Sequence, residues 1–309
     1  MANIIGTIEN DILNGGVFND VIFGDEGDDI ISDIGGNNDV NGAEGNDRIT
    51  MGSETTGSGN DVINGGSGND IIFDFGGNNN ISGGDGNDRI TTYGGVDIIR
   101  GGVGNDGIAS GGGDDTVFGG SGSDTIDAGS GNDKVYGQAG ADFVNGESGS
   151  DFLFGDAGND RVIGGSGDDF QSGGAGNDTI RTHSGLFASG TPERDELYGG
   201  LGLDTFDILS NYLGGTMDPR ATVDQSYAIV RDFSFAEGDR LNLSADPDSY
   251  IIEPGDFNGD GVFNDTFVIL PFQKLIGDSI IVVNNLVAVV ENTNAGALLA
   301  SGVVNAFAP

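Results

Sequence analysis

A nine-residue repeat governs most of this chain. Consecutive nonapeptides run without a gap over residues 6–50 and 56–181, which makes nineteen units. Five residues at 51–55 separate the two blocks, and two further units at 190–207 follow an interruption at 182–189. Self-similarity at so short a period indicates that each unit is a small element that gains stability by stacking on its neighbours.

Three columns of the repeat are nearly constant. Position four is Gly in seventeen of the nineteen units, position six is Asp in seventeen, and position eight is Leu, Ile or Val in eighteen. The exceptions are Glu9 and Phe18 at position four, Asn38 and Asn79 at position six, and Gln171 at position eight. Because neighbouring side chains of an extended segment alternate faces, position eight is predicted to form the core, with positions seven and nine outside. Glycine supplies the positive φ angles that tight turns need, so we expect an all-β stack of short parallel strands.

The aspartates of position six would lie above one another in such a stack. Their mutual repulsion opposes folding unless a cation lies between them. Calcium suits this position, because it accepts six to eight oxygen ligands in flexible geometry and a turn offers carboxylates together with backbone carbonyls. Zinc prefers His or Cys, which the repeats lack, and magnesium usually keeps several waters. The predicted ligands are Asp11, Asp20, Asp29, Asp47, Asp61, Asp70, Asp88, Asp97, Asp106, Asp115, Asp124, Asp133, Asp142, Asp151, Asp160, Asp169, Asp178, Asp195 and Asp204, with turn glycines Gly65, Gly68, Gly83, Gly86, Gly101, Gly104, Gly119, Gly122, Gly173 and Gly176.

Composition divides the chain into two predicted domains. Residues 1–207 hold 51 of the 60 glycines, and residues 208–309 hold nine. The formal net charge of -39 argues against nucleic acid as a partner, since a polyanion repels phosphate. The chain has no cysteine, which excludes disulfides and thiol chemistry, and no apolar run long enough to span a membrane.

The region 208–309 is predicted to be a β-rich cap, because apolar runs occur at 266–270, 280–283 and 286–290. Within it, Asp256, Asn258 and Asp260 match the first half of an EF-hand loop, but the twelfth position is Phe267 instead of Glu. A further calcium site and a plain Asn-Gly, Asp-Gly turn both fit this segment.

The units closely resemble the repeats-in-toxin (RTX) nonapeptide, G-G-x-G-x-D-x-U-x, over about two-thirds of the chain. The resemblance implies a parallel β-roll with 18 residues per coil and calcium in the turns between units two apart, pairing for example Asp106 with Asp124. The pattern is not matched at Asn38, Asn79 and the loop 51–55.

Residues 230–244 resemble the segment that follows the repeats in many secreted bacterial RTX proteins, whose type I export signal is C-terminal and uncleaved. The resemblance implies an extracellular or cell-surface protein. It agrees with the charge, because the repeat region carries a net -30 and would stay unfolded in a calcium-poor cytosol until it meets calcium outside.

Aromatic residues gather at the outward positions of successive coils. Phe118, Tyr136 and Phe154 share position nine, while Phe152 and Phe170 at position seven extend the patch. A ladder that stabilises a flat sheet or a dock for the tail are two interpretations, and a contact surface for another protomer or a surface glycan is a third.

For function, we expect a structural, cell-surface or adhesive protein that is not an enzyme, since no HExxH motif and no GxSxG motif outside the repeat turns occur. A polysaccharide-acting enzyme or accessory module, a calcium buffer and a bare folding module are the alternatives. The repeats begin near Met1, so the first coil either offers an open edge for head-to-tail stacking or is capped by the divergent units that contain Glu9 and Phe18.

Overall fold

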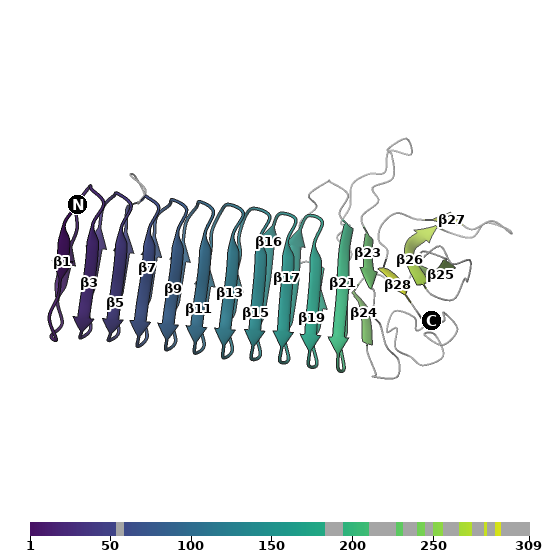
Figure 1. Cartoon of the computed structure of the whole chain (residues 1–309). Coiled ribbons are helices and arrows are strands. Elements are labelled where there is room, and N and C mark those ends of the chain that lie inside the picture. The colour runs from purple at the N-terminus through teal and green to yellow at the C-terminus, as the bar shows by residue number, and fades with distance from the viewer. Residues whose placement is uncertain are drawn as a thin grey trace.

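The computed structural model describes most of the repeat region and part of the tail. The described residues are 1–53, 59–182, 194–209, 227–230, 240–244, 250–255, 266–273, 281–282 and 288–291. All secondary structure in these ranges is β-strand, and the strands form one long stack (Figure 1).

Two parallel sheets run the length of the stack. The larger sheet orders its strands as β1 (Asn3–Ile5), β3 (Val21–Glu26), β5 (Asp39–Glu44), β7 (Val62–Ser67), β9 (Asn80–Asp85), β11 (Ile98–Val103), β13 (Thr116–Ser121), β15 (Lys134–Ala139), β17 (Phe152–Ala157), β19 (Phe170–Ala175), β21 (Arg194–Leu201) and β23 (Tyr227–Val230). The smaller sheet orders its strands as β2 (Ile12–Asn14), β4 (Ile30–Asp33), β6 (Arg48–Met51), β8 (Ile71–Asp74), β10 (Arg89–Thr92), β12 (Gly107–Ala109), β14 (Thr125–Asp127), β16 (Phe143–Ser148), β18 (Arg161–Ser166), β20 (Thr179–Arg181), β22 (Thr205–Leu209) and β24 (Arg240–Ser244). Odd and even strands alternate along the chain, so each coil contributes one strand to each sheet.

Successive coils pair with an offset of two nonapeptide units. Val117 pairs with Val135, and Ile126 pairs with Val144, each one coil further on. Position eight of every unit therefore lies above position eight of the unit two before it. These side chains fill the space between the sheets, and most of them, such as Ile72, Ile90 and Ile126, are fully buried. The predicted all-β parallel β-roll, with two nonapeptides in each coil, is confirmed.

Both insertions leave the register intact. Across the first, Ile49 still pairs with Ile72, and across the second, Ile180 still pairs with Phe206. The structure differs from the sequence prediction at Met51. This residue pairs in register with Asp33 and Asp74 and is fully buried, so it belongs to the roll and not to the inserted loop.

The parallel stack continues beyond Asp207, where the sequence predicts the domain boundary. Strand β23 pairs with β21, and β24 pairs with β22. The remaining strands are β25 (Tyr250–Gly255), β26 (Thr266–Gln273), β27 (Ile281–Val282) and β28 (Ala288–Glu291). Strand β28 pairs parallel to β23, and β26 pairs antiparallel to β25, β27 and β28. The prediction of a separate capping domain stays a prediction.

Membrane-spanning helices are another feature that the described ranges can address. Within these ranges, no helix has the length and apolar character needed to cross a bilayer.

Candidate metal centre

The turns of the roll form two rows, one along each edge of the sheets. The first row joins odd strands to even strands, and its position-six residues are Asp11, Asp29, Asp47, Asp70, Asp88, Asp106, Asp124, Asp142, Asp160, Asp178 and Asp204. The second row joins even strands to odd strands, and its position-six residues are Asp20, Asn38, Asp61, Asn79, Asp97, Asp115, Asp133, Asp151, Asp169 and Asp195. The two rows form one column in the sequence, and the fold separates them to opposite edges.

Glycine makes the turns possible for two reasons. Gly68 and Gly86 have φ angles of 127° and 133°, in the left-handed region that favours glycine. In addition, a Cβ atom on Gly86 would collide with the carbonyl group of Gly68 in the preceding coil. The turns of successive coils therefore stack at a distance that only glycine allows.

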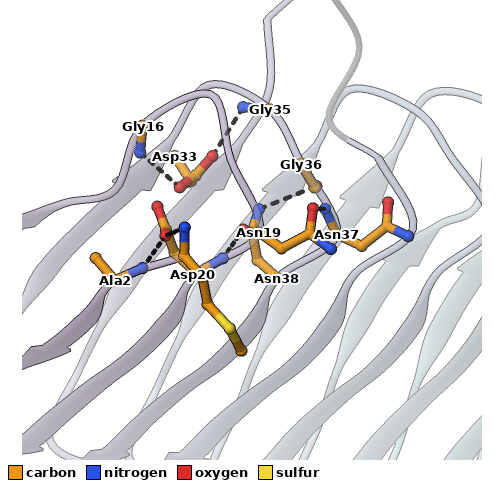
Figure 2. Close-up of polar contacts among 10 residues, drawn as sticks. Ala2, Gly16, Asn19, Asp20, Asp33, Gly35, Gly36, Asn37 and Asn38 are labelled. Atoms are coloured by element: carbon orange, nitrogen blue, oxygen red, sulfur yellow. Dashed lines mark hydrogen bonds and ion pairs between the residues drawn. The ribbon is translucent and has the colours of Figure 1, made fainter.

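Each position-six carboxylate uses one oxygen to join two coils. The backbone amide of Asp106 donates to Oδ1 of Asp124 over 2.8 Å, and the amide of Asp142 donates to Oδ1 of Asp160 over 2.8 Å. The same bond recurs between consecutive coils along both rows, with Asn in place of Asp at Asn38 and Asn79. Figure 2 shows the start of the second row, where the amide of Asp20 donates to Asn38.

The second carboxylate oxygen, Oδ2, has no hydrogen-bond donor in most of the first row. It is buried and unpartnered in Asp29, Asp47, Asp70, Asp88, Asp106, Asp124, Asp142, Asp160 and Asp178. A buried carboxylate oxygen without a donor or a cation costs several kcal/mol in general, so this row lacks a positive partner.

The pKa values of these aspartates reflect the missing positive charge. Burial raises the pKa of Asp70, Asp106 and Asp178 to about 7, although the amide hydrogen bond from the preceding coil opposes the shift. Repulsion from the neighbouring carboxylates of the row raises these pKa values further. A cation at the row would favour the charged form of these carboxylates and so lower their pKa values.

The unpartnered oxygens converge with carbonyl groups beside the glycine of position one. The place that a Cβ atom would take on Gly155 lies 2.5 Å from Asp160 Oδ2 and 2.6 Å from the carbonyl oxygen of Gly173, one coil further on. At Gly119 the corresponding distances, to Asp124 and Gly137, are 2.5 and 2.7 Å. We call the space between these two oxygens the cradle of the turn. Carboxylate and carbonyl oxygens are the ligands that calcium prefers, so the chemistry of the cradle fits calcium.

The carbonyl groups are essential to this fit, because the side chains alone do not make a metal cluster. Across the ranges that the structure covers, no three His, Cys, Asp or Glu side chains group together as a metal site. Each turn brings one carboxylate, and the backbone of two coils brings the other oxygens. Residues with this arrangement would hold calcium through Asp Oδ2 and the position-one carbonyl, and the ion would supply the positive charge that the row lacks.

The predicted site residues are placed as follows. All nineteen predicted aspartates lie in the two rows, and Gly65, Gly83, Gly101, Gly119 and Gly173 each direct a carbonyl oxygen toward the cradle of the preceding coil. The position-four glycines Gly68, Gly86, Gly104, Gly122 and Gly176 have positive φ and stack on one another instead. Asp256, Asn258 and Asp260 lie outside the described residues.

Sequence reasoning missed two features of the second row. Asp33 and Asp74 occupy position one, where they are buried, and Gln171 directs its amide group into a cradle. A signal was present in each case: the two units that begin with Asp are the two with Asn at position six, and Gln171 is the one polar residue of the core column.

The repeats also match a family model. The model describes the RTX calcium-binding nonapeptide repeat, and it matches residues 5–32, 55–73, 73–108, 109–144, 136–171 and 145–180, about half of the chain. This chain belongs to the RTX family. Its RTX repeats accordingly bind calcium ions at multiple sites. A search of curated proteins finds no match to the chain.

Proposed function

We propose that this RTX protein is exported in an unfolded state, folds when it meets extracellular calcium, and serves as a structural or adhesive component outside the cell. The observation that carries the proposal is the first row of turns, in which the buried Oδ2 atoms of nine aspartates, from Asp29 to Asp178, lack a hydrogen-bond donor. A chain with this row gains its fold from a cation, because the ion binds the folded state and not the unfolded one.

The charge of the repeat region supports export before folding. Residues 1–207 carry 37 acidic and seven basic residues. Where calcium is scarce, these charges repel one another and favour an extended chain that can pass through a channel. The C-terminal position of the export signal is part of the proposal, and it rests on the resemblance of residues 230–244.

A non-enzymatic role is also part of the proposal. The position-six aspartates are committed to the two rows, where each joins one coil to the next. The outer face of the larger sheet carries the stacked rings of Phe118, Tyr136 and Phe154, with ring centroids 5.1 Å apart at each step. Such stacking is typical of a rigid scaffold.

Sedimentation velocity across a calcium titration tests the proposal, with magnesium as the control. We expect an expanded monomer without calcium and a compact species with calcium, while magnesium has little effect. Growth to large species with calcium would support self-assembly. An unchanged sedimentation coefficient at every calcium concentration would refute calcium-driven folding.

Export is tested separately. The full chain and a chain that ends before residue 208 are expressed with a bacterial type I secretion system, and the medium is assayed for each. We expect only the full chain outside the cell, and equal export of both would refute the C-terminal signal.

A further inference from the structure

The residue at position one distinguishes the two rows of turns. In the first row it is Gly in every coil from Gly6 to Gly199. In the second row six consecutive coils carry a side chain there, and all six side chains are buried: Asp33, Met51, Asp74, Thr92, Ser110 and Ala128. The second row returns to glycine at Gly146 and Gly164.

A side chain at position one fills the cradle. In the first row, the place of a Cβ atom on Gly137 lies 2.6 Å from Asp142 Oδ2 and 2.8 Å from the carbonyl oxygen of Gly155. These distances are too short for a carbon atom, so the two oxygens can converge there only when position one has no side chain. A side chain at position one therefore takes the space between the two oxygens that calcium would bind.

Two of the six side chains also satisfy the carbonyl group that calcium would bind. The Thr92 hydroxyl donates to the carbonyl oxygen of Ser110 over 2.6 Å, and the Ser110 hydroxyl donates to that of Ala128 over 2.7 Å. The corresponding carbonyl oxygens of the first row face a cradle. The hydroxyl groups thus replace the ion as the link between coils.

The carboxyl groups of these filled turns are buried as in the first row. Oδ2 of Asp97, Asp115 and Asp133 is buried without a hydrogen-bond donor. Because the space beside each carboxyl group holds a side chain, the turn has no room for a metal ion there.

Asp33 and Asp74 close their turns in another way. Asp33 Oδ1 accepts the amide of Gly35 over 2.7 Å, and Asp74 Oδ1 accepts the amide of Gly76 over 2.9 Å, so each side chain caps its own turn. Asp33 Oδ2 also accepts the amide of Gly16 over 2.9 Å (Figure 2).

The position-six residues of these two units are Asn38 and Asn79. Their Oδ1 atoms accept amides from the preceding coil, and their Nδ2 groups donate to the carbonyl oxygens of Gly36 and Gly77 over 3.2 and 3.3 Å. In an Asn side chain at this position, Oδ1 and Nδ2 both form hydrogen bonds within the protein, whereas the second oxygen of a carboxylate needs a cation. The carboxylate has moved from position six to position one, where at Asp33 both of its oxygens accept backbone amides.

We infer that the second row closes without calcium from Asp33 to Ala128 and binds calcium only at Gly146 and Gly164, while the first row binds calcium in every coil from Gly24 to Gly173. The inference rests on the proposed function, because it assigns ions to some turns and excludes them from others. A complete cradle has a carboxylate oxygen within 2.6 Å of the place of a Cβ atom at position one, together with a carbonyl oxygen from the next coil. Among the described residues there are nine such cradles in the first row, from Gly24 to Gly173, and two in the second.

The number of bound calcium ions tests the inference. The full chain is dialysed to equilibrium against saturating calcium, and bound metal is measured by mass spectrometry of the element. We expect about eleven ions per chain, whereas a chain in which both rows bind calcium alike would hold about nine ions in each row. The variant T92G/S110G opens two cradles of the second row and is expected to bind up to two more ions. The matched variant G83S/G101S fills two cradles of the first row and is expected to bind two fewer.

Each outcome of this experiment decides something. Wild-type binding of about nine ions in each row, or a folded T92G/S110G variant that binds no additional calcium, would overturn the inference and leave calcium-driven folding in place. If T92G/S110G does not fold, the wild-type number and the variant D74G/N79D, which restores Gly and Asp to one unit, decide in its place. A wild type that binds no calcium would overturn the proposed function as well.

A second inference concerns Gln171, the polar residue of the core column. Its side chain is fully buried, and neither Oε1 nor Nε2 has a hydrogen-bond partner. The amide end lies 2.5 Å from the place of a Cβ atom on Gly164, where Asp169 Oδ2 at 2.5 Å and the carbonyl oxygen of Thr182 at 2.8 Å also converge. Because no hydrogen bond fixes which amide atom points to the cradle, either atom can take that position.

We propose that Gln171 Oε1 is a calcium ligand at the Gly164 cradle. This assignment, which also rests on the proposed function, explains a buried amide at a position where eighteen other units carry Leu, Ile or Val. An amide oxygen is a normal calcium ligand, and ligation would supply the partner that the side chain lacks.

Two substitutions at Gln171 separate a ligand from a misplaced core residue. Q171L introduces the residue that the column prefers, and Q171E keeps an oxygen at the end of the side chain. We expect Q171L to bind about one calcium ion fewer and to need more calcium to fold, and Q171E to keep the wild-type number. If Q171L instead lowers the calcium requirement and binds as many ions as the wild type, Gln171 is a tolerated polar residue and the assignment fails.

Discussion

The first and second rows of turns carry the same nonapeptide but balance their carboxylates differently. In the first row, Gly at position one leaves a cradle in each coil from Gly24 to Gly173, and the buried Oδ2 atoms of these coils have no hydrogen-bond donor. In the middle of the second row, side chains fill the cradle, and hydroxyl or amide groups bind several of the carbonyl oxygens. The difference teaches that a single Cβ atom, at one position in nine, decides whether a turn has room for a metal.

Removal of calcium is expected to have the largest effect, because it acts on many coils of the first row at once. We expect a chelator to abolish the β-sheet signal in far-UV circular dichroism and to make the repeat region sensitive to protease. The second row cannot hold the fold alone, since each coil shares both rows. Excess calcium should restore both signals, and excess magnesium should not. A chelated chain that keeps its spectrum would contradict the account of the first row.

Matched substitutions break the comparison at single turns. D106N removes a first-row carboxylate, and we expect it to raise the calcium midpoint for folding on the order of tenfold, equivalent to about 1.4 kcal/mol. D97N changes a second-row carboxylate beside Thr92 and is expected to leave the midpoint within about twofold. Calcium titrations followed by intrinsic tyrosine fluorescence measure both. Equal shifts in the two variants would show that the rows are equivalent.

The pH dependence of the calcium-free chain sharpens the comparison further. Burial raises the pKa of Asp70 and Asp106 to about 7, above the value of roughly 4 expected in the unfolded chain. The folded state therefore binds more protons than the unfolded state between about pH 4 and pH 7, and its free energy of unfolding falls as pH rises through this window. We expect acidification from neutral pH toward pH 5 to promote folding without calcium, as measured by circular dichroism in chelator.

With calcium bound, the sign is opposite. Calcium needs the charged carboxylate, so calcium affinity should fall as pH falls through the same window. Calcium affinity that is constant across this window would contradict the role of these carboxylates as ligands.

The smallest effect is expected on the face of the larger sheet, away from both rows. Tyr136 stacks between Phe118 and Phe154, and Y136S should lower the free energy of unfolding of the calcium-loaded chain by about 1–2 kcal/mol, while the number of bound ions stays unchanged. Urea denaturation at saturating calcium measures the first quantity and equilibrium dialysis the second. A loss of bound calcium in Y136S would show that the sheet and the rows are coupled.

Much of this architecture is predictable from the sequence, because the period of nine fixes both the turn and the core. The column from Leu13 to Ile180 gives the buried stripe, and the glycines give the turns. The separation of one Asp column into two unequal rows is harder to predict. It depends on which sheet each unit enters, and position one varies only in the second row, where Asp33, Thr92 and Ala128 have little in common as residue types.

Met51 and Gln171 show a second limit of the sequence. A repeat alignment places Met51 in an insertion, yet the register with Asp33 and Asp74 draws it into the roll, where its apolar side chain is buried. In the sequence, Gln171 is a polar exception in the core column, and only the structure shows that its buried amide group reaches the Gly164 cradle. In both cases the deciding information is contact between coils, which the linear repeat does not contain.

The preserved register across the two insertions has a consequence for how such a chain can diversify. The stretch of sequence within a coil lengthens at each insertion, while Ile49 and Ile180 keep partners of the next coil as regularly as Val117 does elsewhere. The additional sequence therefore leaves the pairing of the flanking strands in register. A protein built in this way can gain sequence between two strands without any change in strand pairing. The length of such an insertion and the geometry of the metal-binding turns are therefore independent of each other.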